Sequence, residues 1–452
     1  MKILIVGAGV VGYNLAEELS HEGHDIAIID NDAEKIKIIS DKLDVLGIRG
    51  NACMPSELIR AGIRETEMLI AVTNKDEINI FVCMLGEKFK VKKRFTRLRE
   101  LEFSGDRQIF RPEELFIDQA INPGQIIIDF VTKILKTPGA VNVAEFADGE
   151  ILLRGFDVQD NAPLAGKKIE DIRAMAELNS FLVVAIIREG NLIIPNNGHE
   201  ILPGDKIYML TAKEFLPLIL PMLNKRADEI EKIVIFGANS VSVNLAKKLE
   251  TWVPDISIIE PSLEKADLAV DELTKTVVLH GDGTDPHLFN EINMKDADFF
   301  MALTDDDEHN ILSALLAKKH GAKRTMVITN DPYYVPILDS IGMDITINPR
   351  LITIGAILKH LRRGMVRSVY KLSENDAEVL EIVINPKSAI VGKKMGKINI
   401  PSEAIIGAIL RNGEMIVPDQ GTQIEAGDSV IVVALPKCIE KIEKLFGKRR
   451  IF

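Results

Sequence analysis

The sequence predicts an α/β chain with two tandem Rossmann-like parallel-sheet domains, each followed by a small α+β C-terminal domain. Three observations predict this class. Short apolar, β-branched runs alternate with amphipathic helical segments in both halves of the 452-residue chain. A glycine-containing turn follows the first apolar run of each half, at Gly7 and at Gly237. The motifs of the second half repeat those of the first in the same order, which indicates an internal duplication.

The composition is that of an ordinary globular protein, because 46% of the residues are apolar and 27% are charged. No apolar run approaches the roughly 18 residues that a membrane-spanning helix needs. The formal net charge of −12 argues against a dedicated nucleic-acid binder. Met1 leads directly into the first strand, and Cys53, Cys83 and Cys438 form no CxxC pattern. We therefore expect no signal peptide, no disulfide framework and a reducing, cytoplasmic location.

The first turn has the spacing of a dinucleotide-binding fingerprint. An apolar strand over residues 3–6 is followed by Gly7, Gly9 and Gly12 in G-x-G-x-x-G order, and then by an amphipathic helix over 13–21. Gly7 permits the tight turn, Gly9 lets a pyrophosphate approach the backbone, and Gly12 packs the helix close to the strand. Free N–H groups and the positive end of the helix dipole then face the phosphates. The alternative is a purely structural role, in which these glycines only shape a tight turn and bind no ligand.

The second strand ends in an acidic residue at the distance that this fingerprint requires. Asp30 closes the strand over 25–29 and stands 18 residues after Gly12. A carboxylate at this place binds ribose hydroxyls and repels a 2′-phosphate, so NAD(H) is favoured over NADP(H). ATP and ADP keep a free ribose and remain acceptable ligands.

The rest of the first domain continues the alternation of strands and helices. Helices are expected over 33–43 and 56–61 and from about 79 to 89, and strands over 45–48, 68–72 and 93–97. In doubly wound parallel sheets, ligands bind beyond the carboxyl ends of the strands. Asn51, Thr73 and Arg97 fall at such ends, as do Gly7 and Asp30, and are therefore candidate site residues.

The duplication can be followed residue by residue. Residues 232–237 match residues 2–7, and Glu260 stands 230 positions after Asp30. The slow drift of this offset along the chain is typical of a duplication with small changes in loop length. Further matched pairs are Thr73 and Thr304, Asn79 and Asn310, Asn122 and Asn348, Gly166 and Gly392, and Gly204 and Gly427.

The repeat divides the chain into seven segments. They are a nucleotide-binding domain over 1–124, a crossover helix and linker over 125–150, a C-terminal domain over 151–221, a linker over 222–231, a second nucleotide-type domain over 232–350, a second crossover helix over 351–370, and a second C-terminal domain over 371–452. In the last segment, residues 405–410 and 415–418 are predicted to form a β-hairpin around Asn412-Gly413.

This layout resembles, over essentially the whole chain, the TrkA family of regulatory (RCK/KTN-domain) subunits of Trk-type potassium uptake systems. No single motif carries the resemblance; the order of the motifs does. They are the turn over 7–12, Asp30, Thr73 with Asp76-Glu77 and Asn79, Thr96-Arg97-Leu98-Arg99, Thr137-Pro138-Gly139-Ala140, Phe146-Ala147-Asp148-Gly149, Asp306-Asp307-Glu308, and His360-Leu361-Arg362-Arg363-Gly364.

The resemblance implies a cytoplasmic regulatory ring and not an enzyme. Such a ring of four chains would dock on the inner face of the membrane, on a potassium-translocating subunit of the TrkH/TrkG type, with no nucleic acid involved. NAD(H), and also ATP or ADP, would bind the first domain and shift the ring between conformations. By position, the implied contacts are Gly7, Ala8, Gly9, Val10 and Val11 on the phosphates, Asp30 on the ribose, Asn51 and Ala52 near the adenine, Thr73 and Asn74 at the far end, and Arg97 as a positive charge.

The second turn departs from the family's pattern. It reads Gly237-Ala238-Asn239-Ser240-Val241-Ser242, so that only the first glycine survives. Asn239 puts a side chain where the backbone should meet phosphate, and Ser242 thickens the contact between helix and strand. A weaker second site is expected, with Gly237 and Glu260 as its remaining residues. In the first unit, Asn51 stands where many such domains have Asp, which removes one charge and should not prevent binding.

Two other classes of function stay open. An NAD-dependent oxidoreductase would share the nucleotide-binding domain, but it normally adds a different substrate domain with a catalytic His, Lys or Tyr. Here the next large unit repeats the first, so no catalytic residue is expected. The third interpretation is a nucleotide sensor without a membrane partner.

Three local features have competing interpretations. The acids over 76–77 and 305–308 are favoured as helix N-terminal residues over paired acid–base groups. His280, Asp282, Asp285 and His287 have a metal-like spacing but fall in a predicted loop, so no metal site is expected. The apolar face of the helix over 125–136 covers either a second unit or the core of its own unit.

Overall fold

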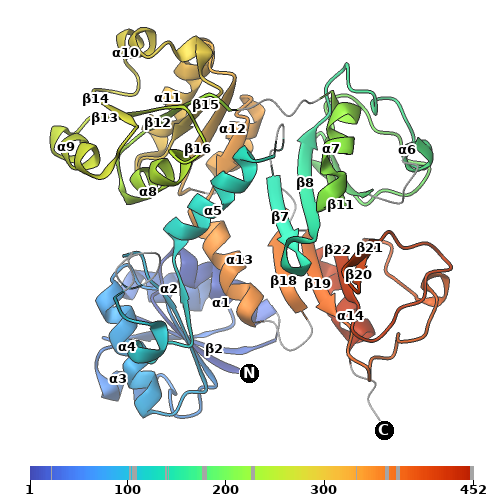
Figure 1. Cartoon of the computed structure of the whole chain (residues 1–452). Helices are drawn as coiled ribbons and strands as arrows, with labels where there is room; N and C mark the ends of the chain where they lie inside the picture. Colours follow the sequence, from blue (N-terminus) through green and yellow to red (C-terminus); the bar gives the residue numbers. More distant parts are fainter. Residues whose placement is uncertain are drawn as a thin grey trace.

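The computed structural model describes residues 1–21, 23–100, 103, 109–137, 140, 142–175, 181–224, 230–331, 333–361, 366–372 and 377–447. Two parallel-sheet domains lie on one side of the molecule and two antiparallel-sheet domains on the other (Figure 1). Helices α5 (Pro123–Leu135) and α13 (Pro349–Leu361) run between them through the centre. The predicted fold class is confirmed.

The first domain contains a six-stranded parallel sheet in the order β3-β2-β1-β4-β5-β6. This order places the switch point between β1 and β4, where a doubly wound sheet binds its ligand. The strands are β1 (Lys2–Val6), β2 (Asp25–Asp30), β3 (Leu46–Arg49), β4 (Met68–Ala71), β5 (Lys93–Arg97) and β6 (Gln119–Ile121), and the helices are α1 (Val10–His21), α2 (Ala33–Lys42), α3 (Pro55–Arg60), α4 (Asp76–Lys88) and the 3-10 helix η1 (Pro112–Leu115).

The third domain repeats this sheet in the order β14-β13-β12-β15-β16-β17. Its core is built in the same way, with the central strands β12 and β15 buried. The strands are β12 (Lys232–Phe236), β13 (Asp255–Glu260), β14 (Val277–His280), β15 (Phe299–Ala302), β16 (Arg324–Ile328) and β17 (Ile345–Ile347), and the helices are α8 (Ser240–Leu249), α9 (Leu263–Glu272), α10 (Pro286–Glu291), η5 (Met294–Asp296), α11 (Asp307–Lys319) and α12 (Tyr334–Ser340).

Each C-terminal domain is a five-stranded antiparallel sheet with short helices. The sheet orders are β10-β9-β11-β8-β7 and β18-β19-β22-β20-β21. The first contains β7 (Asn142–Phe146), η2 (Ala147–Gly149), β8 (Ile151–Asp157), α6 (Ile169–Met175), β9 (Phe181–Arg188), β10 (Asn191–Ile193), β11 (Lys206–Ala212), η3 (Lys213–Phe215), α7 (Leu216–Ile219) and η4 (Leu220–Leu223). The second contains β18 (Val366–Lys371), β19 (Glu378–Val383), η6 (Met395–Lys397), β20 (Ala404–Arg411), β21 (Glu414–Ile416), β22 (Ser429–Ala434) and α14 (Pro436–Phe446).

Some expected boundaries differ from those observed. Helix α4 begins at Asp76, three residues before the expected start, because the acids Asp76 and Glu77 form its first turn. Strand β7 falls within the expected linker segment (125–150) and β18 begins in the expected crossover segment (351–370) and ends at Lys371, yet each forms an edge of a C-terminal sheet. The predicted hairpin is confirmed, because β20 pairs with β21 around Asn412-Gly413.

The two crossover helices are exchanged between the halves. Helix α5 packs on α8 of the third domain, while α13 packs on α1 of the first. Ile354, Ile357 and Leu358 of α13 are buried in the core of the first domain. The Lys248 ammonium of α8 lies 2.8 Å from the Asp129 carboxylate of α5. The apolar face of the first crossover helix therefore covers a second unit and also packs on the C-terminal domain of its own half, so both alternatives left open above apply.

The C-terminal sheets also pack against one another. A single cluster of buried side chains joins Phe146, Leu153 and Tyr208 of the first sheet to Val379 and Ile431 of the second. Both halves thus share cores that neither could complete alone. Within the described residues, no helix is both long enough and apolar enough to cross a bilayer.

Candidate functional site

The first glycine turn has the geometry that a phosphate-binding loop needs. Gly7 has a φ of +105°, and a β-carbon there would lie 3.0 Å from the Thr73 backbone nitrogen. A β-carbon on Gly12 would lie 1.8 Å from the Gly7 carbonyl oxygen, so only glycine lets α1 pack this closely. Gly9 is different, because a β-carbon there would meet nothing within 4 Å. The space above Gly9 is therefore a cradle that a side chain would fill and that a phosphate group fits.

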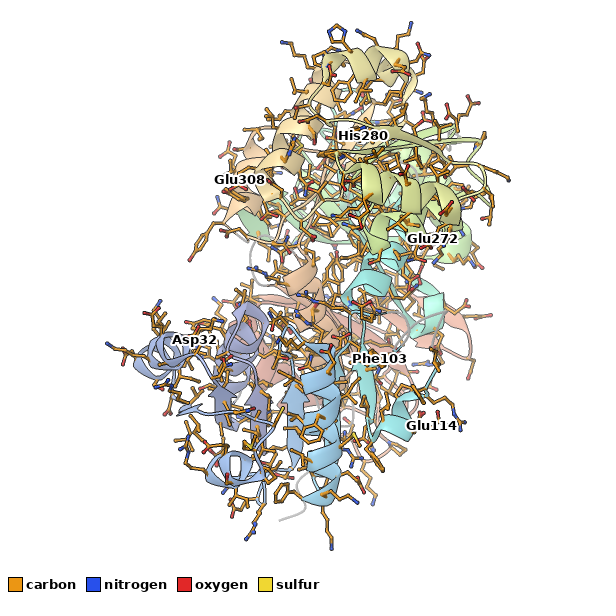
Figure 2. All side chains as sticks on the ribbon, turned by 90° about the vertical axis from the view of Figure 1, so that its left-hand side faces the viewer. Asp32, Phe103, Glu114, Glu272, His280 and Glu308 are labelled. Carbon is orange, nitrogen blue, oxygen red and sulfur yellow. The ribbon has the colours of Figure 1, made fainter. Side chains whose placement is uncertain are left out.

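Asp30 holds this turn from the end of the neighbouring strand. Its Oδ2 accepts a hydrogen bond of 2.6 Å from the Ala8 amide, and its Oδ1 accepts one of 2.9 Å from the Asp32 amide. Each carboxylate oxygen has a second lone pair, so both can still accept a hydrogen bond from a ribose hydroxyl. Asp32, two residues further on, caps α2 and is labelled in the lower domain of Figure 2. The site residues Gly7, Ala8 and Asp30 thus form one unit.

The other predicted residues lie along the same carboxyl edge of the sheet. Asn51 follows β3 and accepts a hydrogen bond of 2.9 Å from the Cys53 amide, while Ala52 is buried beside it. Thr73 follows β4, and Asn74 is exposed directly after it. Val10 and Val11 begin α1, with Val10 exposed and Val11 buried. The structure therefore gathers all these residues at the ends of β1 to β5.

Asn79, which the sequence analysis did not name as a site residue, joins two parts of the candidate site. Asn79 Oδ1 accepts hydrogen bonds from the Thr73 amide at 3.0 Å and the Thr73 hydroxyl at 2.8 Å, and its Nδ2 donates to the Arg97 carbonyl at 2.9 Å. Asn310 makes the same bonds to Thr304 and to the Ile328 carbonyl in the third domain. The signal was the repeated pairing of a threonine with an asparagine six residues later. These amides join the ends of two neighbouring strands.

Arg97 supplies a buried positive charge beside this network. The residue is 8% exposed, and its Nη2 donates a hydrogen bond of 3.1 Å to the Thr73 carbonyl. Burial, together with the nearby Arg99 and Arg350 guanidinium groups, lowers the pKa of Arg97 to about 10, and the Asp76 carboxylate partly opposes this shift. Arg97 remains protonated at neutral pH.

The second turn is built differently. Asn239 caps α8 by accepting a hydrogen bond of 3.0 Å from the Ser242 amide, and its Nδ2 donates one of 2.6 Å to the Leu303 carbonyl. The Asn239 side chain therefore spans the place that lies open above Gly9. Glu260 keeps the role of Asp30, accepting bonds from the Ala238 amide at 2.6 Å and the Ser262 amide at 2.8 Å. Gly237 keeps its positive φ of +100°.

The residues with metal-like spacing have local roles. Asp285 caps α10, and Asp282 accepts hydrogen bonds from the Thr284 amide and hydroxyl. His309 Nε2 lies 2.9 Å from Asp282 Oδ1, whereas His280 Nε2 lies 3.1 Å from the Pro261 carbonyl oxygen. Figure 2 shows His280 and Glu308 on different parts of the upper domain. Across the part of the chain that the structure describes, no three His, Cys, Asp or Glu side chains are grouped to hold a metal ion.

The acids at the starts of α4 and α11 hold loops together. Asp76 Oδ2 accepts hydrogen bonds from the Arg99 and Glu100 amides at 2.7 and 2.9 Å. Asp307 accepts hydrogen bonds from the Asn330 and Asp331 amides in the matching place. These carboxylates tie the segment after β5 or β16 to a helix N-terminus, in agreement with the favoured interpretation.

Comparisons with known proteins agree with this arrangement along the whole chain. The TrkA-N domain family matches residues 3–123 and 233–349, and the TrkA-C domain family matches residues 153–218 and 379–447. The Trk system potassium uptake protein TrkA of Halomonas elongata is 34% identical over 451 residues, covering 99% of this chain and 98% of that protein. The protein of the same name from Haemophilus influenzae is 33% identical over 458 residues and both chains are covered completely.

Solved structures share the fold at lower sequence identity. The RCK domain of GsuK superposes with a TM-score of 0.62 at 17% identity, covering 98% of this chain and 94% of that one. The GsuK channel bound to NAD gives a TM-score of 0.61 at 16% identity, covering 98% of this chain and 78% of that one. Since the two domain families match most of the chain and relatives of the same length reach 34% identity, the chain belongs to the TrkA family of Trk system potassium uptake proteins.

Proposed function

We propose that this chain is a nucleotide-binding regulatory subunit that gates a Trk-type potassium uptake channel or transporter. NAD(H), or alternatively ATP or ADP, binds at the first glycine turn and shifts the conformation of a ring of chains. The observation that carries the proposal is the open cradle above Gly9 beside the Asp30 carboxylate. Family membership and the NAD held by the GsuK channel, a protein of the same fold, support it.

Each side chain has a defined task in this proposal. The N–H groups at the start of α1 face the phosphates, and the absence of a side chain at Gly9 lets the ligand reach them. Asp30 orients the ribose and excludes a 2′-phosphate. The bound nucleotide supplies charge and contact area, and no reaction is required of it.

The exchanged helices offer a route from the ligand to the rest of the molecule. Helix α1, which begins at the glycine turn, packs on α13. Helix α13 leads through residues 362–365 of the chain to β18, an edge strand of the second C-terminal sheet. Suppose that α1 and α13 move together between two positions, and that the nucleotide binds one of them more tightly. Binding then shifts the equilibrium between the two positions by an amount set by the difference in affinity.

The partner and the location follow from the same proposal. The ring would contain four chains and would sit on the cytoplasmic face of the membrane, on a potassium-translocating subunit of the TrkH/TrkG type. Co-purification of the two subunits from membranes tests this, with the chain carrying Gly9→Val as a comparison. Failure of the wild-type chain to co-purify would favour a nucleotide sensor without a membrane partner.

Calorimetric titration with NADH, NAD, ATP and ADP tests the nucleotide site directly. One site per chain, lost in Gly9→Val, is the expected result. Two sites per chain would mean that the turn at Gly237 also binds, with Glu260 in the role of Asp30. The absence of binding would remove the basis for nucleotide control. Steady turnover of NADH with a small carbonyl substrate would instead favour an oxidoreductase.

A further inference from the structure

A cavity of about 300 Å³ lies between the two parallel-sheet domains. The first domain contributes Arg97, Arg99 and the start of α5 to its wall, and the third contributes the starts of α8 and α13 with the ends of β15 and β16. Neither Asp30 nor any residue of the first glycine turn is among the lining residues. The cavity therefore adjoins the proposed nucleotide site and shares Arg97 with it, but it does not include the first glycine turn or Asp30.

Three arginines line this space, Arg97, Arg99 and Arg350. Arg97 is 8% exposed, and its Nε has no hydrogen-bond partner among the described residues. Among the residues that line the cavity, the one carboxylate is that of Asp305, which is exposed, and the Asp76 carboxylate acts electrostatically on Arg97. Positive charge is therefore in excess.

Three helices also begin at the cavity. Pro123 of α5, Ser240 of α8 and Pro349 of α13 are lining residues, and each lies in the first turn of a helix of at least ten residues. The N-terminal ends of helices carry a partial positive charge and unpaired N–H groups. Asn348, which precedes Pro349, is 6% exposed and its Nδ2 has no partner among the described residues. This unused buried donor is adjacent in the chain to the lining residue Pro349, and Asn348 itself does not line the cavity.

The duplication of the chain does not explain this charge. Ile328 and Asn330 occupy the positions that match Arg97 and Arg99, and Gly124 occupies the position that matches Arg350. All six residues line the cavity, which therefore straddles the two related halves. The arginines occur once each and gather in one place, although their mutual repulsion opposes this.

We propose that this cavity binds a small multivalent anion of the phosphate type, held by Arg97, Arg99 and Arg350. The guanidinium groups match phosphate oxygens in geometry as well as in charge. Such an anion joins the first domain to the starts of α8 and α13. Its source is either a free anion such as pyrophosphate or the terminal phosphates of a nucleotide.

Calorimetric titration of the full chain with sodium pyrophosphate tests the site. We expect one bound anion per chain and a dissociation constant that rises about tenfold or more in Arg350→Gln, because a charge-assisted hydrogen bond is lost. Arg64→Gln, which removes an exposed arginine outside the cavity wall, is the matched control and should bind as the wild type does. Unchanged affinity in Arg350→Gln, or no binding by the wild type, would overturn the proposal.

A second variant, Asn244→Asp, tests the site in case Arg350→Gln does not fold. Asn244 lies one helical turn into α8 and lines the cavity, and its Nδ2 donates to the Ser240 carbonyl at 2.6 Å. Asn244→Asp keeps the shape but adds a negative charge, so it should also weaken pyrophosphate binding. Near-UV circular dichroism establishes that both variants are folded. Normal pyrophosphate binding by a folded Asn244→Asp chain would count against the site.

Two variants distinguish failure of the proposed anion site from failure of the proposed nucleotide site. Gly9→Val should lose NADH binding and keep pyrophosphate binding, whereas Arg350→Gln should do the opposite. Loss of pyrophosphate binding in Gly9→Val would place the anion at the first turn and overturn the proposal. Competition by ATP that disappears in Gly9→Val identifies nucleotide phosphates as the source, and the absence of competition identifies a free anion.

Discussion

At the scale of single residues, glycine acts in two opposite ways in the first turn. Gly7 and Gly12 are glycine because the protein itself occupies the neighbouring space. Gly9 is glycine although the protein leaves that space open. A side chain at Gly12 would damage the fold, whereas one at Gly9 would only fill the cradle. This contrast separates the requirements of folding from those of binding.

Gly9→Val is therefore expected to abolish NADH binding while changing the free energy of unfolding by less than about 1 kcal/mol. The new side chain has no protein neighbour, but it blocks the approach of phosphate. Fluorescence titration with NADH and urea denaturation measure the two effects. Gly198→Val, in a loop of the first C-terminal domain, is the control. Full NADH binding by Gly9→Val would show that the ligand lies elsewhere.

Glu250 shows how a carboxylate can organise a chain reversal. It accepts hydrogen bonds from the Thr274 hydroxyl at 2.7 Å, the Lys275 amide at 2.8 Å and the Thr276 amide at 2.9 Å. Burial raises the pKa of Glu250, but these bonds outweigh burial and hold it at about 2, below the ordinary 4.5. The stabilisation is thus complete above pH 4.5 and is lost as pH falls from there towards 2.

Glu250→Gln should lower the free energy of unfolding by about 1–3 kcal/mol at pH 7, because charged acceptors are replaced by a neutral amide. The difference from the wild type should shrink as pH falls below 4.5. Urea denaturation at several pH values measures both. Glu291→Gln, at the exposed end of α10, should change little. A difference that does not depend on pH would show that geometry, and not charge, causes the loss.

At the scale of elements, α5 and α13 are the parts that join the halves. Their apolar faces read from the sequence as ordinary amphipathic helices, and each packs on the domain of the other half. Hydrophobic periodicity reports which face is buried, but it carries no information on which domain buries it. The exchange is therefore a property of the tertiary structure.

Ile357→Ala tests the contact between α13 and the first domain. Ile357 is 1% exposed in a core with residues of α1, so the substitution should cost about 2–5 kcal/mol of stability. Leu351→Ala, on the same helix but 40% exposed, is the matched control and should cost far less. Chemical denaturation followed by circular dichroism compares them. Equal losses in both variants would contradict the packing of α13 on α1.

At the scale of the whole molecule, the two halves form one intramolecular pair. The Arg324 guanidinium of the third domain donates a hydrogen bond of 2.6 Å to the Ala140 carbonyl of the first half, and Glu381 accepts one of 3.2 Å from the Ala147 amide. Neither half closes its core alone, because each places a helix in the other. The chain is thus organised like a two-fold dimer that has been fused.

The first half alone, residues 1–224, is expected to form a homodimer. Ile128 and Val131 of α5 match Ile354 and Ile357 of α13, so a second copy of α5 supplies apolar residues where α13 was removed. Light scattering coupled to size-exclusion chromatography measures the mass. A soluble monomer would show that the face left by α13 needs no cover.

The sequence by itself determined the α/β class, the duplication and the alternation of strands and helices, and it predicted that Gly7, Gly9, Asp30, Thr73 and Arg97 follow the carboxyl ends of parallel strands. These features depend on local periodicity and on the carboxyl ends of parallel strands, which the chain order dictates. Only the tertiary structure decided that α5 and α13 are exchanged, that Asn239 spans the second turn, and that three arginines converge on one cavity. Those features depend on contacts between residues far apart in the chain, and no local pattern specifies which distant surface a side chain will meet.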